Sequence, residues 1–296
     1  MDPELQKLYS PSLWNQRMPP EEVVLAHGKF LAKNSESARK NLKSFSYKFS
    51  DSDPEQSIEI FYKDNDFEII DGKYLNFKAG KIFIYIHGGY WQWGSVKDSS
   101  FMAENMAEKN VITIAVGYTI APQATMSEIV SQVERAVAKV LEYSGESEVY
   151  ICGHSAGGHL ASILLFTNFE QKFNVSSKNL KGLIPVSGIF DLRPLLKTDV
   201  NDNLKMVLEE STILSPMLLK ESHLNKETKF LIAYAQNDSP AFHAQSEDFK
   251  NYISNELGYK NVRTEKIDCS DHFDVIENIS QNEFILTKKI FEFMKA

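Results

Sequence analysis

The stretch VYICGHSAGGHLAS, at residues 149–162, decides the expected fold of this chain. Residues 148–152 predict a strand, and the small residues over 156–166 predict a helix. Between them, Gly-His-Ser-Ala-Gly at 153–157 matches Gly-x-Ser-x-Gly, a sharp turn from strand to helix that exposes a serine hydroxyl above a sheet. Glycines suit such a turn because its backbone is strained. The stretch therefore predicts a nucleophilic Ser155 at the carboxyl ends of parallel strands.

Strands and helices alternate along the rest of the chain. Short apolar or alternating runs predict strands, which cover residues 58–62, 81–86, 111–116, 183–186, 229–234 and 262–267. Helical periodicity covers residues 20–31, 101–109, 127–143, 242–252 and 284–294. This order predicts an α/β fold in which a mostly parallel, doubly wound sheet carries helices on both faces.

The length of 296 residues and the hydrophobic share of 43% fit one domain over residues 1–296. Residues 1–50 are polar and contain several prolines, which predicts an N-terminal helical arm or lid with a helix that begins near Pro20. Residues 191–225, approximately, lack a clear strand and are expected to form a cap insertion.

Charge and composition narrow the range of partners. The net charge of −8 makes nucleic acid and anionic membranes poor partners, because an acidic chain repels phosphate groups. Met1 to Ser10 contain no apolar signal-peptide core, and no apolar run approaches the roughly 20 residues of a membrane span. We therefore expect a cytoplasmic protein in which Cys152 and Cys269 are reduced. A disulfide between these two cysteines is the alternative.

A glycine pair follows the predicted strand at 81–86. In His87-Gly88-Gly89-Tyr90, the two glycines allow the backbone to turn its amides toward a ligand. The amides of Gly88 and Gly89, together with that of Ala156, are expected to form an oxyanion hole. His87 is expected to brace the loop without titrating in catalysis.

The base should follow the last strand, because this fold orders its triad as serine, acid and histidine. His272 lies in that position. Among the other late histidines, His159 is expected to pack in the elbow helix, His223 to be exposed and His243 to lie at a helix start.

The acid should follow the preceding strand, and Asp238 lies four residues beyond Tyr234. Its Asn-Asp-Ser-Pro context also suits a helix cap, so a capping role is the alternative. Asp271 and Asp274 lie too close to His272 in sequence, while Glu247 and Asp248 are expected on a solvated helix face. No histidine or cysteine cluster has metal-ligand spacing, so neither a metal nor another cofactor is expected.

Aromatic residues gather near these loops. Tyr90, Trp91, Phe190 and Phe242 are the candidate substrate-binding residues, and an aromatic leaving group would stack on them. Trp93 and Phe273 belong to the same group by position. The alternative for all six is packing in the core.

Four motifs together resemble those of one enzyme family. They are HGGYW at 87–91, GHSAGG at 153–158, GYTIAP at 117–122 and GIFDL at 188–192. The chain resembles the arylformamidases, or kynurenine formamidases, in the hormone-sensitive-lipase-like branch of the α/β-hydrolases, from about residue 80 to the end. Tyr90 departs from the commoner esterases, which have a third glycine there, and Asp238 lies outside their usual Asp-Pro-Leu context.

The resemblance implies an amidohydrolase that cleaves N-formyl-L-kynurenine to L-kynurenine and formate in tryptophan degradation. Its partner would be a small aromatic formamide, and either a monomer or a homodimer is compatible with the sequence. One alternative is a general carboxylesterase or lipase with the same residues and a different pocket. Another is a hydrolase-like binding module without turnover; such modules usually lack a triad member, whereas Ser155, Asp238 and His272 are all present.

Overall fold

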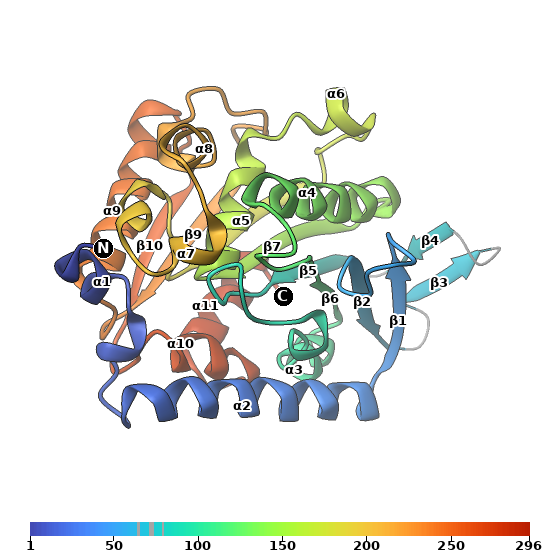
Figure 1. The fold of residues 1–296 in the computed structure, drawn as a ribbon. Coiled ribbons are helices and arrows are strands. Elements are labelled where there is room, and N and C mark those ends of the chain that lie inside the picture. The colour runs from blue at the N-terminus through green and yellow to red at the C-terminus, as the bar shows by residue number, and fades with distance from the viewer. Residues whose placement is uncertain (64–65, 71–73, 79) are drawn as a thin grey trace.

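An eight-stranded sheet forms the centre of the fold (Figure 1). The computed structural model describes residues 1–63, 66–70, 74–78 and 80–296. The strands run in the order β1-β2-β6-β5-β7-β8-β9-β10, parallel from β6 to β10, whereas β2 is antiparallel to both β1 and β6. Their bounds are β1 Lys43–Lys48, β2 Ser57–Tyr62, β5 Lys81–Ile86, β6 Val111–Val116, β7 Glu148–His154, β8 Leu180–Val186, β9 Lys229–Ala235 and β10 Val262–Ile267.

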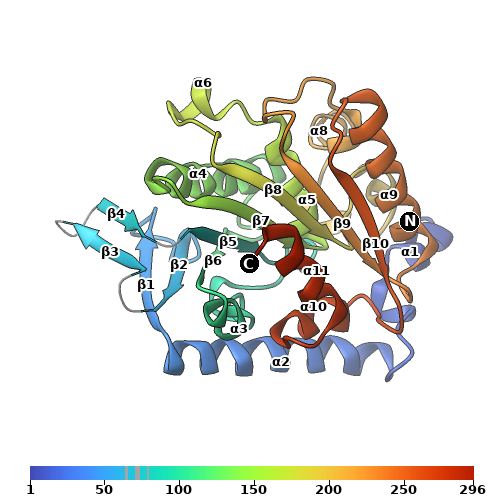
Figure 2. The ribbon, with the colours of Figure 1, turned by 180° about the vertical axis from the view of Figure 1, so that it is seen from behind.

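Helices cover both faces of this sheet, as Figures 1 and 2 show from opposite sides. One face carries α4 (Met126–Tyr143), α5 (Ala156–Ile163) and α9 (Pro240–Asn251), and the other α3 (Ala103–Glu108), α10 (Asp274–Glu277) and α11 (Ile285–Met294). Side chains of each central strand alternate between the two faces. In β5, Ile82 and Ile84 belong to the first core and Phe83 and Tyr85 to the second. The predicted doubly wound α/β class is confirmed.

The predicted strands β5, β6 and β10 have the bounds that the sequence indicated. The elbow helix is shorter than predicted, because its last turn, Leu164–Phe166, is 3-10. The helix after β9 begins earlier, at Pro240, with Ser239 as its cap. A π-helical turn, Tyr252–Glu256, follows it.

The N-terminal region is helical only to Asn41. It contains α1 (Pro3–Leu8), a 3-10 turn (Pro11–Leu13) and α2 (Pro20–Asn41), and α2 runs along one side of the molecule beside α3 and α10 (Figure 2). Residues 43–48, grouped with the arm by the sequence analysis, instead form β1 at the edge of the sheet. This strand gave little signal, because only Phe45 and Tyr47 alternate with polar residues.

The remaining elements are short. A hairpin of β3 (Phe67–Ile70) and β4 (Tyr74–Phe77), which the sequence analysis did not assign, lies apart from the main sheet. Residues 191–225 contain no strand, as expected. They hold a 3-10 turn at Arg193–Lys197, α7 (Asn201–Leu204), α8 (Leu208–Ile213) and a second turn at Pro216–Leu218. The other short helices are α6 (Phe169–Phe173) and 3-10 turns at Val96–Asp98 and Asn278–Ser280.

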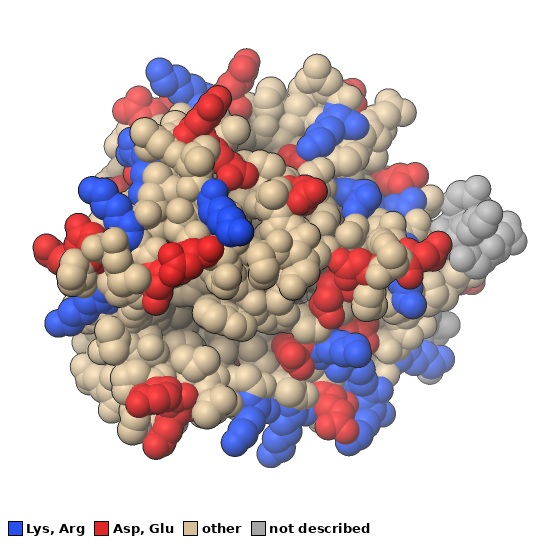
Figure 3. Space-filling view, viewed as in Figure 1, with Lys and Arg blue, Asp and Glu red and all other residues tan. Residues whose placement is uncertain are grey.

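The surface seen in Figure 3 mixes acidic and basic side chains around a largely uncharged centre. The net charge of −8 is therefore not concentrated on this face. Within the described ranges, none of the helices has both the length and the apolar composition of a bilayer span.

Candidate active site

Ser155 lies at a strained turn between β7 and α5. Its φ of 53° falls in the left-handed region that non-glycine residues rarely adopt. Two glycines of the motif are required by close approach of backbone atoms. A Cβ on Gly153 would lie 2.0 Å from the Gly157 carbonyl oxygen, and one on Gly157 would lie 2.1 Å from the Ile86 carbonyl oxygen. The predicted nucleophile elbow is thus present, with Ser155 almost fully buried.

The loop after β5 lies directly against the elbow. A Cβ on Gly88 would come within 3.1 Å of the Ser155 Cβ, so this backbone passes beside the serine. Within the described part of the chain, the amides of Gly88 and Gly89 donate to no protein acceptor. The Ala156 amide is the first of α5, where amides lack intrahelical partners. Gly88 and Ala156, which carry two of the three predicted oxyanion donors, therefore lie beside Ser155, and Gly89 follows Gly88 in the same loop.

The two residues after Gly89 keep positive φ angles without being glycine. Tyr90 has φ 51° and Trp91 has φ 58°, and Gln92 closes a tight turn by donating from its amide to the Gly89 carbonyl. Tyr90 therefore adopts a backbone conformation that favours glycine, at the position where the commoner esterases have a glycine. Strain of this kind persists only where the surroundings fix the backbone.

His87 braces this loop, as predicted from its position. Its Nδ1 lies 2.9 Å from the Gly88 carbonyl oxygen, and its ring stacks on Tyr118 with centroids 4.2 Å apart. The Tyr118 hydroxyl donates to the His87 carbonyl. Burial lowers the pKa of His87, so this histidine is neutral at pH 7.

The predicted acid and base are paired. His272 Nδ1 lies 2.6 Å from Asp238 Oδ1, and both side chains are buried. The other oxygen, Oδ2, accepts from the Ser187 hydroxyl at 2.6 Å and from the Ala235 amide at 2.9 Å. The loops after β9 and β10 are joined as well, because the Asn237 amide donates to the Ser270 carbonyl.

His154, inside the elbow motif, connects the nucleophile to the loop that carries the base. Its Nε2 lies 2.8 Å from the His272 carbonyl oxygen, and the two rings have centroids 4.8 Å apart. Burial and the neighbouring His272 lower the pKa of His154 well below its usual value, so Nε2–H donates from a neutral ring. The sequence analysis did not identify this role, since the position is variable in the motif.

The carboxylates near His272 are engaged elsewhere. Asp271 forms a bidentate pair with Arg17, at 2.6 and 3.1 Å. Burial opposes the charge of Asp271, but hydrogen bonds from Arg17 and two amides outweigh burial and lower its pKa. Burial, together with the smaller effect of repulsion from Asp271, raises the pKa of Asp274 to about 6.

Glu247 and Asp248 lie on α9, where the sequence predicted a solvated helix face. Glu247 accepts a hydrogen bond from the Tyr234 hydroxyl, and Asp248 is exposed.

The predicted aromatic residues lie in different environments. Phe242 packs edge-on against His272, with centroids 4.7 Å apart. Phe190 stacks on Phe249 at 4.0 Å and, like Trp91, is fully buried. Tyr90 is half-buried. Of the other two, Phe273 contacts His272, at 5.7 Å between ring centroids, and Trp93 is largely exposed.

The N-terminal arm reaches this group, which the sequence did not reveal. The Leu8 carbonyl accepts from Ser239, and the Tyr9 carbonyl accepts from the Tyr90 hydroxyl. The Tyr9 ring packs against Phe242 at 5.9 Å, and its hydroxyl accepts from Gln245 Nε2 at 2.9 Å. The arm therefore contacts both the oxyanion loop and the acid loop.

The other histidines and the cysteines are placed largely as expected. His159 is buried, with Nε2 2.7 Å from the Leu214 carbonyl oxygen, while His223 is exposed. His243 lies in the first turn of α9. Both cysteines are free; Cys152 is buried and Cys269 exposed.

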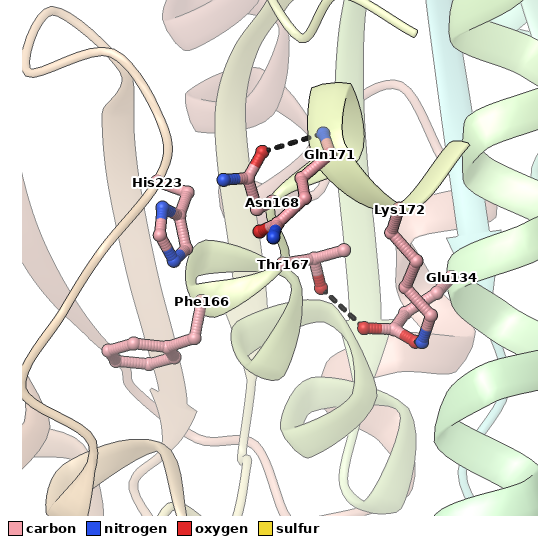
Figure 4. A pocket seen from close by; sticks show the side chains of 7 residues that line it. All are labelled: Glu134, Phe166, Thr167, Asn168, Gln171, Lys172 and His223. Carbon is pink, nitrogen blue, oxygen red and sulfur yellow. Dashed lines mark hydrogen bonds and ion pairs between the residues drawn. The ribbon is translucent and has the colours of Figure 1, made fainter. Parts of the chain in front are cut away.

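A shallow cavity of about 430 Å³ lies elsewhere, beside α4 and α6 (Figure 4). Thr167 and Lys172 both contact Glu134 at its wall, and His223 faces it from the opposite side. None of the predicted site residues lines it. Among the described residues, no three His, Cys, Asp or Glu side chains gather as a metal-binding group.

The sequence of this chain is similar to those of known hydrolases. Residues 74–253, more than half of the chain, match the model of the BD-FAE family. Kynurenine formamidase from Salmo salar is 37% identical over 98% of this chain and 96% of its own length. The corresponding protein from Danio rerio is 38% identical over 98% and 95%. The chain belongs to the kynurenine formamidase family.

Solved structures agree with this membership at the level of fold. A proposed thioesterase from Silicibacter sp. TM1040 superposes with a TM-score of 0.77 at 22% identity, over 96% of this chain and 98% of the other. An arylesterase superposes with a TM-score of 0.63 at 16% identity, over 98% and 99%. This chain thus has the α/β-hydrolase fold that these structures share.

Proposed function

We propose that this arylformamidase hydrolyses N-formyl-L-kynurenine to L-kynurenine and formate, as a step of tryptophan degradation. Similarity to two kynurenine formamidases over nearly the whole chain is the observation that carries the substrate. The pairing of His272 with Asp238, beside the elbow of Ser155, supports a serine mechanism. No metal or other cofactor takes part in this scheme.

In the first half of the reaction, His272 Nε2 removes the proton of the Ser155 hydroxyl as Oγ attacks the formyl carbon. The amides of Gly88, Gly89 and Ala156 stabilise the negative charge that develops on the formyl oxygen. When the carbon–nitrogen bond breaks, the nitrogen takes the proton from His272 and leaves as the aryl amine of kynurenine. Ser155 keeps the formyl group as an ester.

In the second half, water attacks this formyl ester while His272 takes a proton from the water. The new tetrahedral species collapses, Ser155 regains its proton from His272, and formate leaves. Asp238 receives the hydrogen bond from Nδ1–H throughout, which holds the imidazole in the tautomer whose Nε2 is basic. The net reaction consumes one formamide and one water and yields the arylamine, formate and a proton.

The aromatic residues are proposed to select the substrate. Formyl is the smallest acyl group, so the formyl-enzyme tolerates the bulky Tyr90 and Trp91 next to the oxyanion loop. Phe242, already packed on His272, would receive the aromatic ring of the leaving group, with Phe190 behind it. Residues 1–296 act as one domain in this proposal, with the arm and the segment at 191–225 as covering elements, and the protein works in the cytoplasm.

Covalent labelling tests the proposed nucleophile directly. A fluorophosphonate should react at Ser155, as mapped by peptide mass spectrometry, and N-formyl-L-kynurenine should slow the labelling. Ser162→Ala is a matched control, because Ser162 is a buried serine of α5 whose hydroxyl donates to the Gly158 carbonyl of the same helix. Labelling should persist in Ser162→Ala and disappear in Ser155→Ala; labelling at another serine would reject the proposed triad.

A further inference from the structure

Ser187 directly follows β8, between the elbow and the acid. It is fully buried, and its φ of 47° lies in the left-handed region. Its hydroxyl donates to Asp238 Oδ2 at 2.6 Å. Backbone strain of this kind persists only where the surrounding structure holds the residue in place. Ser187 is therefore held firmly beside the carboxylate that pairs with His272.

The bonds around Asp238 show what this contact does. Oδ1 faces His272, while Oδ2 accepts from Ser187 and from the Ala235 amide. With His272 as its only partner, the carboxylate could rotate about its Cβ–Cγ bond. The two donors at Oδ2 fix the plane of the carboxylate, so that Oδ1 stays aimed at the imidazole.

The backbone beside Ser187 is fixed on both sides. The Ser187 amide donates to the Ala233 carbonyl of β9 at 2.8 Å. The carbonyl of the preceding residue, Val186, accepts from the Ser155 amide at 2.9 Å. Two consecutive residues therefore hold the proposed nucleophile and the proposed acid at a set separation.

We propose that Ser187 is a positioning residue that acts on the reaction through Asp238. The inference rests on the proposed triad and adds to it a fourth side chain, which orients the acid from the side opposite His272. A purely structural role, in which Ser187 only satisfies a buried oxygen, would affect folding but not the chemical step in particular.

A double-mutant cycle separates these roles. Ser187→Ala should lower kcat and the rate of fluorophosphonate labelling by about 10-fold with KM unchanged, because it removes a hydrogen bond to a charged group. In the Asp238→Asn background, the same change should cost less than about 2-fold, because residues that act as one unit are not additive. Equal losses in the two backgrounds, or no loss in either, would overturn the proposal.

Two further variants keep the test decisive. Ser187→Gly tolerates the positive φ and replaces Ser187→Ala if that variant does not fold. Ser246→Ala removes a buried hydroxyl of α9 that has no hydrogen-bond partner among the described residues, and it should keep the wild-type rates. Labelling outside Ser155 would reject the triad itself, whereas labelling of Ser155 at an unchanged rate in Ser187→Ala would reject only the role of Ser187.

Discussion

The carboxyl edge of the sheet and the N-terminal arm meet around His272, yet they are built in different ways. At the sheet edge, each functional side chain lies on a short loop that follows its own strand, as Ser155 follows β7 and Asp238 follows β9. The arm reaches the same place through contacts between residues far apart in sequence, such as Arg17 with Asp271. From this difference we expect the edge to carry out the proposed chemistry and the arm to affect access to the site and the stability of the fold.

The largest expected effect lies at the sheet edge. Ser155→Ala removes the attacking oxygen and should lower kcat for N-formyl-L-kynurenine by about 10⁶. Steady-state kinetics measure this, with circular dichroism to verify the fold. Substantial remaining turnover would remove Ser155 from the mechanism.

The same substitution, aspartate to asparagine, can be made at the sheet edge and at the contact with the arm, and we expect different effects at the two places. Asp238→Asn should lower kcat by about 10⁴, because the histidine loses its orienting anion. Asp271→Asn breaks the pair with Arg17 in the arm, and its effect should appear mainly as a lower Tm. If Asp271→Asn shows the large kinetic loss and Asp238→Asn does not, the acid has been assigned to the wrong region.

The arm should affect catalysis more weakly. Tyr9→Ala removes a ring that packs on Phe242 next to His272, so kcat/KM for the formamide should fall by about 10-fold, within the range of apolar pocket changes. Tyr9→Phe keeps the ring and should retain most of the activity. An unchanged kcat/KM in Tyr9→Ala would show that the arm does not shape the pocket.

The smallest expected effect is on stability and depends on pH. The pKa of Asp274 in the folded protein is about 6, above its unfolded value, so this group destabilises the fold as pH rises from about 4 to 6. Because the carboxyl is partly exposed, we discount the cost for screening to about 1 kcal/mol at neutral pH.

Asp274→Asn should therefore raise Tm by about 2 °C at pH 7.5 and by very little at about pH 3, where the aspartate is mostly protonated in both the folded and the unfolded state. Thermal unfolding at the two pH values measures this. An equal gain at both would assign the effect to packing instead of charge.

The contrast between local loops at the sheet edge and long-range contacts of the arm also explains which features the sequence could predict. The elbow, the glycine loop and the strands β5, β6 and β10 follow from local patterns, because turn chemistry and apolar runs act over a few residues. Ser187 and Tyr9 gave no such signal, since their roles depend on partners across the fold, Asp238 and Gln245. The strand β1 was missed for a related reason, as a short edge strand with polar alternate residues carries little pattern.

The substrate preference is the most direct test of the central claim. The measurement is kcat/KM for N-formyl-L-kynurenine against p-nitrophenyl acetate, with the butyryl analogue of the same arylamine as a third substrate. We predict that the formamide exceeds the acetate ester despite the better leaving group of the ester, and that the butyryl analogue is the poorest. A preference for the ester or for longer acyl chains would contradict the formamidase assignment and indicate an esterase with the same triad.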